Sequence, residues 1–211
     1  MTKDELRAVV KEVTGRDDKQ TLINTALDLG LRDIARRHDF RCFVKTAALS
    51  ASTHEVSLPS DFRKFLSLRA NEASRAYMIE LRNMGWVLKR FPHIEEHPEG
   101  NPIYSFIRGN TLVLAPRPKD TLTLSLVYVS KPEFPAEEAF DELLIAYAAS
   151  YTFNGIGMVD VGRVWRQDYE MALHQAILDD KRTNEFLIHD GFQQTFEPQV
   201  LEPHLDPFRR Y

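Results

Sequence analysis

Two histidines and a glutamate near the middle of the chain have the spacing of a zinc-binding motif. His93, Glu96 and His97 fit the pattern H-x-x-E-H of inverted zinc peptidases. That pattern needs a helix, because the two imidazoles must lie one turn apart on the same face. Pro98 follows at once, further breakers come after it, and no third ligand is apparent downstream. We therefore interpret residues 92–102 as an exposed charged loop and keep a zinc-dependent hydrolase as the weaker of two alternatives.

The other candidate chemical groups stand in patterns that favour structure over catalysis. The single cysteine, Cys42, lies beside Phe40 and Phe43 with no base placed to activate it, so we expect a small core residue. Gly155 and Gly157 lack the third glycine and the preceding strand of a dinucleotide site, and they indicate a turn between helices. No nucleophile elbow, Walker loop or C-x-x-C pair is present. The sequence predicts no catalytic residue, no metal and no cofactor.

Composition and charge narrow the class of protein. A length of 211 residues with 43% hydrophobic and 27% charged residues is typical of one soluble domain with an elaboration. The formal net charge of −4 lacks the basic excess that supports non-specific binding to nucleic acids. One cysteine and no apolar segment long enough for a signal peptide or a membrane span favour synthesis in the cytoplasm.

A DNA-binding helix-turn-helix protein is the other alternative. It would use two N-terminal helices joined at Gly15, with phosphate contacts from the arginines in and just after the second helix: Arg32, Arg36, Arg37 and Arg41. Aspartates alternate with these arginines at Asp28, Asp33 and Asp39. Such alternation is more typical of a solvated or partner-facing helix surface than of a phosphate-binding one.

Helical patterns occupy both ends of the chain. Thr2 and Glu5 form a capping box, and Gly15 suits the left-handed residue that ends the first helix. A second apolar stripe runs from Leu22 toward Asp39. After residue 132, two more stripes predict a helix hairpin; the first runs from Phe140 to Tyr151, and the second contains Val161, Val164, Trp165, Tyr169, Ala172, Leu173, Ala176 and Ile177. We expect these stripes to be core.

The region between the helices has the period of strands. Residues 43–49 and 54–58 are joined by a small polar turn, and residues 103–107 meet 111–115 across a turn containing Gly109, so both pairs are predicted hairpins. Residues 121–129 alternate, which predicts a strand with one wet face. The fold class is therefore α+β: a helical core of residues 1–41 and 132–189, an inserted antiparallel β region of residues 42–131, and an extended C-terminal arm of residues 190–211.

One turn and the arm are the segments most suited to partners. The turn from Leu58 to Phe62 ends a strand at Pro59, with Asp61 expected to cap the next turn of the chain and Phe62 to anchor it. Prolines in the arm forbid a continuous helix, while its large apolar residues recur too often for a solvated tail: Phe192, Phe196, Leu201, Leu205, Phe208 and Tyr211. We expect these arm residues, with Leu58 and Phe62, to bind a partner.

The order of these elements resembles the head-to-tail adaptor proteins of tailed bacteriophages. The shared features are an N-terminal helix pair, a β insertion carrying the turn from Leu58 to Phe62, a hairpin strand ending at Leu112 to Pro116, a paired helical segment and a long arm. The resemblance implies a structural virion protein at the head-tail junction. It also implies a homo-oligomeric ring, expected to be a dodecamer, whose arms bind the portal protein and whose β region faces a tail tube or nozzle protein. DNA would pass through the lumen without sequence-specific binding, and a negatively charged lumen would let it slide.

Overall fold

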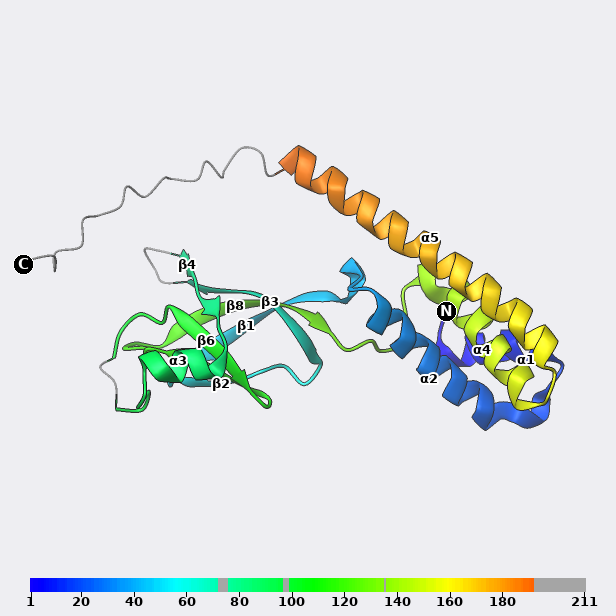
Figure 1. Cartoon of the computed structure of the whole chain (residues 1–211), viewed down its shortest axis with the longest axis horizontal. Helices are drawn as coiled ribbons and strands as arrows, with labels where there is room; N and C mark the ends of the chain where they lie inside the picture. The colour runs from blue at the N-terminus through cyan, green and yellow to red at the C-terminus, as the bar shows by residue number, and fades with distance from the viewer. Residues whose placement is uncertain (72–75, 97–98, 135, 192–211) are drawn as a thin grey trace, which may run out of the picture.

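The structure is a computed structural model that describes residues 1–71, 76–96, 99–134 and 136–191. Its helices and strands form two lobes (Figure 1). One lobe holds the helices α1 (Lys3–Thr14), α2 (Gln20–Arg37), α4 (Asp141–Gly155) and α5 (Val159–Gly191). The other holds the strands and the short helix α3 (Met84–Arg90). The predicted α+β fold, with helices from both ends of the chain around a β insertion, is confirmed.

The N-terminal helices begin and end where their capping residues predict. The Thr2 hydroxyl accepts a hydrogen bond from the Glu5 amide, and the Glu5 carboxylate accepts one from the Thr2 amide, so the predicted capping box is present. Gly15 ends α1 with φ +62°, a conformation that glycine adopts without strain. A short 3-10 turn, Asp17–Lys19, then reverses the chain into α2.

The predicted hairpin of α4 and α5 is also confirmed. The two helices pack side by side after a turn in which Gly157 has φ +85°. The helices approach closely at Gly162, whose carbonyl accepts a hydrogen bond of 2.8 Å from the Ser150 hydroxyl. A Cβ atom at Gly162 would lie 2.5 Å from Oδ1 of Asn154, so only glycine fits there without a shift.

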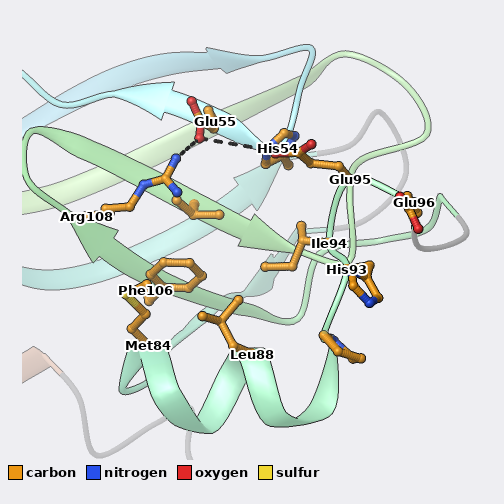
Figure 2. A pocket seen from close by; sticks show the side chains of 12 residues that line it. His54, Glu55, Met84, Leu88, His93, Ile94, Glu95, Glu96, Phe106 and Arg108 are labelled. Carbon is orange, nitrogen blue, oxygen red and sulfur yellow. Dashed lines mark hydrogen bonds and ion pairs between the residues drawn. The ribbon is translucent and has the colours of Figure 1, made fainter.

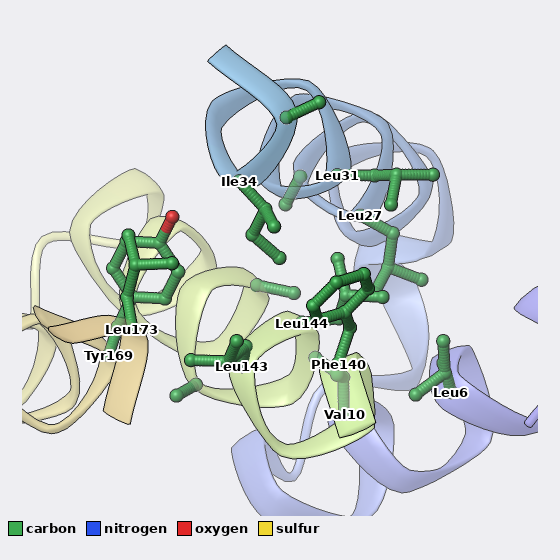
Figure 3. Packing of buried hydrophobic residues seen from close by; sticks show 14 of the residues in the cluster. Leu6, Val10, Leu27, Leu31, Ile34, Phe140, Leu143, Leu144, Tyr169 and Leu173 are labelled. Atoms are coloured by element: carbon green, nitrogen blue, oxygen red, sulfur yellow. The ribbon is translucent and has the colours of Figure 1, made fainter. Parts of the chain in front are cut away.

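All four long helices contribute to one apolar cluster (Figure 3). Its buried members include Leu6, Val10, Leu27, Leu31, Ile34, Phe140, Leu143, Leu144, Tyr169 and Leu173. The prediction for α5 was partly wrong, because Val161 and Val164 are 37% and 57% exposed. The buried stripe of α5 is narrower than its apolar pattern, since only one face of the helix meets α4 and α2.

The strands form two four-stranded sheets. The first has the order β1 (Val44–Ala51), β8 (Leu122–Ser130), β3 (Phe62–Asn71), β4 (Ala76–Met78). The second has the order β2 (Glu55–Ser57), β7 (Thr111–Ala115), β6 (Tyr104–Arg108), β5 (Glu80–Leu81). All pairs are antiparallel except β5 with β6, which is parallel and departs from the predicted antiparallel pattern. The β8 strand alternates as predicted, with its leucines buried and Thr123 exposed.

One of the two predicted hairpins is present and the other is wrong. Strands β6 and β7 pair across the turn at Gly109, as expected. Strands β1 and β2, in contrast, do not pair with each other, because β1 pairs along its length with β8 and β2 pairs with β7. The polar turn after Ala51 therefore carries the chain from one sheet to the other. Alternation identifies a strand but does not identify its partner.

The two lobes are joined by contacts as well as by the chain. Phe43 and Val129, from the ends of the β lobe, are buried in the helical cluster. Arg63 on β3 donates to the Ala35 carbonyl near the end of α2 and to the Asp39 carboxylate. The start of β3 is thus fixed to the end of α2.

Candidate interaction surfaces

His93, the first histidine of the zinc-like motif, does not lie on a helix as the zinc-binding pattern requires. Helix α3 ends at Arg90, and residues 91–96 form turns, so His93 is not on a helix. His97 lies outside the described residues. Within the described ranges, no group of three histidine, cysteine, aspartate or glutamate side chains is placed to hold a metal ion.

The motif borders a pocket of about 270 Å³ in the β lobe (Figure 2). Its inner wall is apolar and contains Met84, Leu88 and Phe106, while His54, Glu55, Arg108 and Glu95 lie at the rim. Two of these rim groups form an ion pair, in which Arg108 donates to Glu55. Nε2 of His54 lies 3.8 Å from Glu55 and 4.0 Å from Glu95. Charged groups of this kind are typical of a solvated surface.

The turn from Leu58 to Phe62 is held from inside the β lobe. Leu58 is 4% exposed and its amide donates to the Asn110 carbonyl over 3.0 Å. The Phe62 amide donates to the Pro59 carbonyl over 3.0 Å, which closes the turn, and the Phe62 ring stacks on Tyr128. Because the Leu58 side chain is buried in its own subunit, it positions the turn, and a partner would meet the residues around it.

Asp61 does not cap a following turn as predicted, because β3 begins at the next residue. Its carboxylate instead accepts hydrogen bonds from Nζ of Lys45 on β1, at 2.7 Å, and from the hydroxyl of Tyr128 on β8, at 2.9 Å. The hydrogen bond from Lys45 lowers the pKa of Asp61, and the one from Tyr128 acts in the same direction. Together they outweigh partial desolvation, which by itself would raise the pKa. Asp61 therefore connects the start of β3 to two other strands.

Cys42 differs from its prediction as a core residue. It is exposed, in the 3-10 turn Arg41–Phe43 between α2 and β1. Although the residue is exposed, neighbouring protein desolvates its thiol, and this burial together with Glu137 and Asp180 raises the pKa to about 11. A thiol with so high a pKa is a poor nucleophile at neutral pH, which agrees with a non-catalytic role.

An apolar stripe on α5 faces solvent and was not predicted. We call it the α5 stripe and define it as Val161, Val164 and Met171, which are 37%, 57% and 65% exposed. These residues recur at i, i+3 and i+10 and therefore share one face of the helix, on which Asp168 at i+7 is also exposed. Met158 and Val159, at the α4–α5 turn, are also 48% and 51% exposed. The apolar positions were visible in the sequence, but the direction of the packed face was not.

A buried polar network fixes α5 to α2. The hydroxyl of Tyr169 is buried and donates to Oδ2 of Asp33 over 2.8 Å. Arg37 donates to the same Asp33 oxygen at 2.9 Å and to both carboxylate oxygens of Glu170, at 2.9 and 3.1 Å. Burial would raise the pKa of Asp33, but the hydrogen bond from Tyr169 and the charge of Arg37 outweigh it and lower the pKa. The network holds the α5 stripe on a rigid support.

The same network weakens the helix-turn-helix interpretation. Arg36 and Arg37 both pair with Asp33, and Arg41 lies 3.5 Å from Asp180. Eight of the 18 residues of α2 are buried, and the helix packs against α4. Three of the four arginines that would contact phosphates are thus already paired with carboxylates of the chain itself.

The remaining predicted partner-binding residues lie beyond the described part of the chain: Phe192, Phe196, Leu201, Leu205, Phe208 and Tyr211. Their role stays a prediction. Within the described residues, no helix combines the length and the apolar character needed to cross a membrane.

A comparison with protein families gives a match to this chain. A family model described as "SU10 adaptor protein" matches residues 1–187. That match includes all of the strands and helices described above except the last four residues of α5. A search of curated proteins found no match.

Proposed function

The chain belongs to the SU10 adaptor protein family, a family of phage head-tail adaptors, and on that premise we propose that it forms a ring in the virion between the portal and the tail. The predicted resemblance to head-tail adaptors is therefore confirmed. The observation that carries the proposal is the extent of the match, which covers both lobes. A family of structural adaptors also favours a protein that is not an enzyme.

The α5 stripe supports the ring. In a closed ring each subunit offers two different surfaces, one to each neighbour. Three apolar side chains exposed on one face of a rigid helix are suited to such a contact: Val161, Val164 and Met171. We assign the α5 stripe to one side of the contact between subunits. The expected ring is a dodecamer, as the family resemblance implies.

The arm and the turn have separate roles in the proposal. The arm binds the portal through the residues Phe192, Phe196, Leu201, Leu205, Phe208 and Tyr211. The surface around the turn from Leu58 to Phe62 faces a tail tube or nozzle protein, with Leu58 supporting the turn from within. The net charge of −4 per chain, repeated around a ring, gives a lumen that does not retain DNA.

The test compares the full chain with a chain ending at Gly191, each mixed with the portal protein of the same phage. The shortened chain keeps every described helix and strand, so it should fold and stay soluble. It should not join the portal, whereas the full chain should, as measured by the mass of the complexes. Equal co-assembly of both chains would contradict the role of the arm.

A further inference from the structure

A groove of about 520 Å³ lies where the middle of α5 passes the start of α4. Three core residues form its floor, since Phe40, Phe140 and Leu143 line it and are only 2–4% exposed. Ala172 and Ala176 of α5 form one wall. Small side chains on that wall leave room for a large apolar group above the floor. The groove is thus shaped for aromatic or aliphatic side chains.

The rim of the groove is acidic. Its lining residues include four carboxylates, from Glu137, Glu142, Asp179 and Asp180, and one guanidinium, from Arg41. Asp180 is engaged by His38, at 2.8 Å, and by Arg41, and Asp179 accepts a hydrogen bond of 2.9 Å from Gln175 and lies 4.0 Å from Arg182. Negative charge still dominates, and the Cys42 thiol at the rim responds to it, because Glu137 and Asp180 both contribute to its raised pKa. An occupant should therefore be apolar and basic.

The chain itself contains a segment of that chemistry. Residues 208–211 read Phe-Arg-Arg-Tyr, with two aromatic residues flanking two arginines. From Gly191, at the end of α5, back to Asp180 the helix rises ~17 Å. The chain from Gly191 to Phe208 can span up to ~56 Å when extended, so the segment can reach the groove with slack.

We propose that in the free subunit the segment Phe208–Tyr211 binds in this groove of its own chain. The aromatic rings lie on the floor formed by Phe40, Phe140 and Leu143, and the arginines face Glu137 and Glu142. One part of this inference rests on the proposed function: when the arm binds the portal, the segment leaves the groove. Until then the segment stays bound to its own chain.

The expected strength of this contact suits a reversible latch. Exposed ion pairs contribute little, and the apolar floor is small. Tethering compensates, because a short flexible connection gives an effective concentration in the millimolar range. A portal surface that binds the whole arm can then displace it.

Cys42 provides a native probe of the groove, since it lines the groove and is the only cysteine in the chain. A bound segment should shield its thiol. Alkylation is followed at about pH 10, because the thiol with its pKa raised to about 11 is partly ionised there. In the full chain, Phe208→Ala combined with Tyr211→Ala, or Arg209→Gln combined with Arg210→Gln, should therefore raise the rate of Cys42 alkylation several-fold. Val200→Ala changes an apolar residue of the arm outside both the segment and the residues assigned to the portal, and it is the control, which should keep the wild-type rate.

Alkylation of both double variants at the wild-type rate would overturn the proposal. A wild-type rate that rises on dilution would also overturn it, because it would place the segment in the groove of another copy. The variants must have the same thermal unfolding midpoint as the wild type, because partial unfolding would also expose Cys42 and raise its alkylation rate. The alkylation experiment contains no portal protein, so unchanged alkylation rates contradict the groove proposal and do not contradict the adaptor function. In the same way, a failure to bind the portal contradicts the adaptor function and not the groove proposal.

Discussion

Asp61 is the residue that gives the turn after Leu58 its fixed position. Its carboxylate accepts hydrogen bonds from Lys45 on β1 and Tyr128 on β8, and its carbonyl accepts one of 2.6 Å from the Lys131 amide. Three parts of the β lobe therefore meet at one residue. The turn is therefore held rigidly, which is what a docking surface for a tail protein requires.

Replacing Asp61 with asparagine should make stability less dependent on pH. The folded state lowers the pKa of Asp61, so its contribution is complete above the unfolded value of about 3.9 and is lost as pH falls through the lower folded value. Asp61→Asn should therefore be less stable than the wild type at pH 7, by about 1 kcal/mol after allowance for solvent screening. Urea unfolding between pH 7 and pH 2 should show this gap closing in acid.

Asp120→Asn removes an exposed charge in the loop before β8 and serves as the control. It should leave the pH dependence as in the wild type. If the difference in free energy of unfolding between the wild type and Asp61→Asn stays constant down to pH 2, the contact of Asp61 with Lys45 is not ionic in solution.

At the scale of elements, the register of α5 against α4 depends on one glycine. A Cβ atom at Gly162 would lie 2.5 Å from Asn154 Oδ1 and 3.1 Å from the Ser150 carbonyl oxygen. The backbone oxygen cannot move without moving α4. Alanine is normally the better helix former by about 1 kcal/mol, so propensity and packing oppose each other here.

Gly162→Ala should destabilise the chain by roughly 1–3 kcal/mol, because overpacking outweighs the gain in helix propensity. Gly100→Ala is the control, since its Cβ atom would meet Pro116 at an ordinary 3.5 Å. Denaturant unfolding of both variants measures the difference. A Gly162→Ala protein as stable as the wild type would show that the helices can separate slightly at little cost.

The elements that the sequence predicted well are those with local signals. The capping box at Thr2, the left-handed Gly15 and the turn at Gly109 each act within a few residues, and all three are present. Strand pairing is a long-range choice, so alternation could not show that β1 pairs with β8 and not with β2. The exposed apolar residues of α5 were missed for a similar reason. Apolar positions cover more of this helix than the face that contacts α4 and α2, and the sequence does not show which of them lie outside that contact.

At the scale of the whole molecule, the candidate surfaces lie on different parts of an elongated two-lobed subunit (Figure 1). The α5 stripe belongs to the helical lobe and the turn after Leu58 to the β lobe. Different surfaces for neighbours and for the tail allow a ring to close while it still presents a platform.

Val164→Glu combined with Met171→Glu should prevent ring formation without unfolding the subunit. Both side chains are more than half exposed, so the folded monomer tolerates the charges. At a contact between subunits, two buried carboxylates should weaken association at least ~10-fold, or about 1.4 kcal/mol. Sedimentation of the ring measures this. Leu66→Glu, at a 43% exposed residue of β3, is the control and should still assemble. Rings formed by the double variant would remove the α5 stripe from the interface.

The mass of the complex between the full chain and its portal protein tests the central proposal most directly. Native mass measurement should find one discrete complex, with twelve adaptor chains expected on each portal ring, and the chain ending at Gly191 should be absent from it. A full-length chain that stays unbound at concentrations where the portal ring is intact would contradict the account.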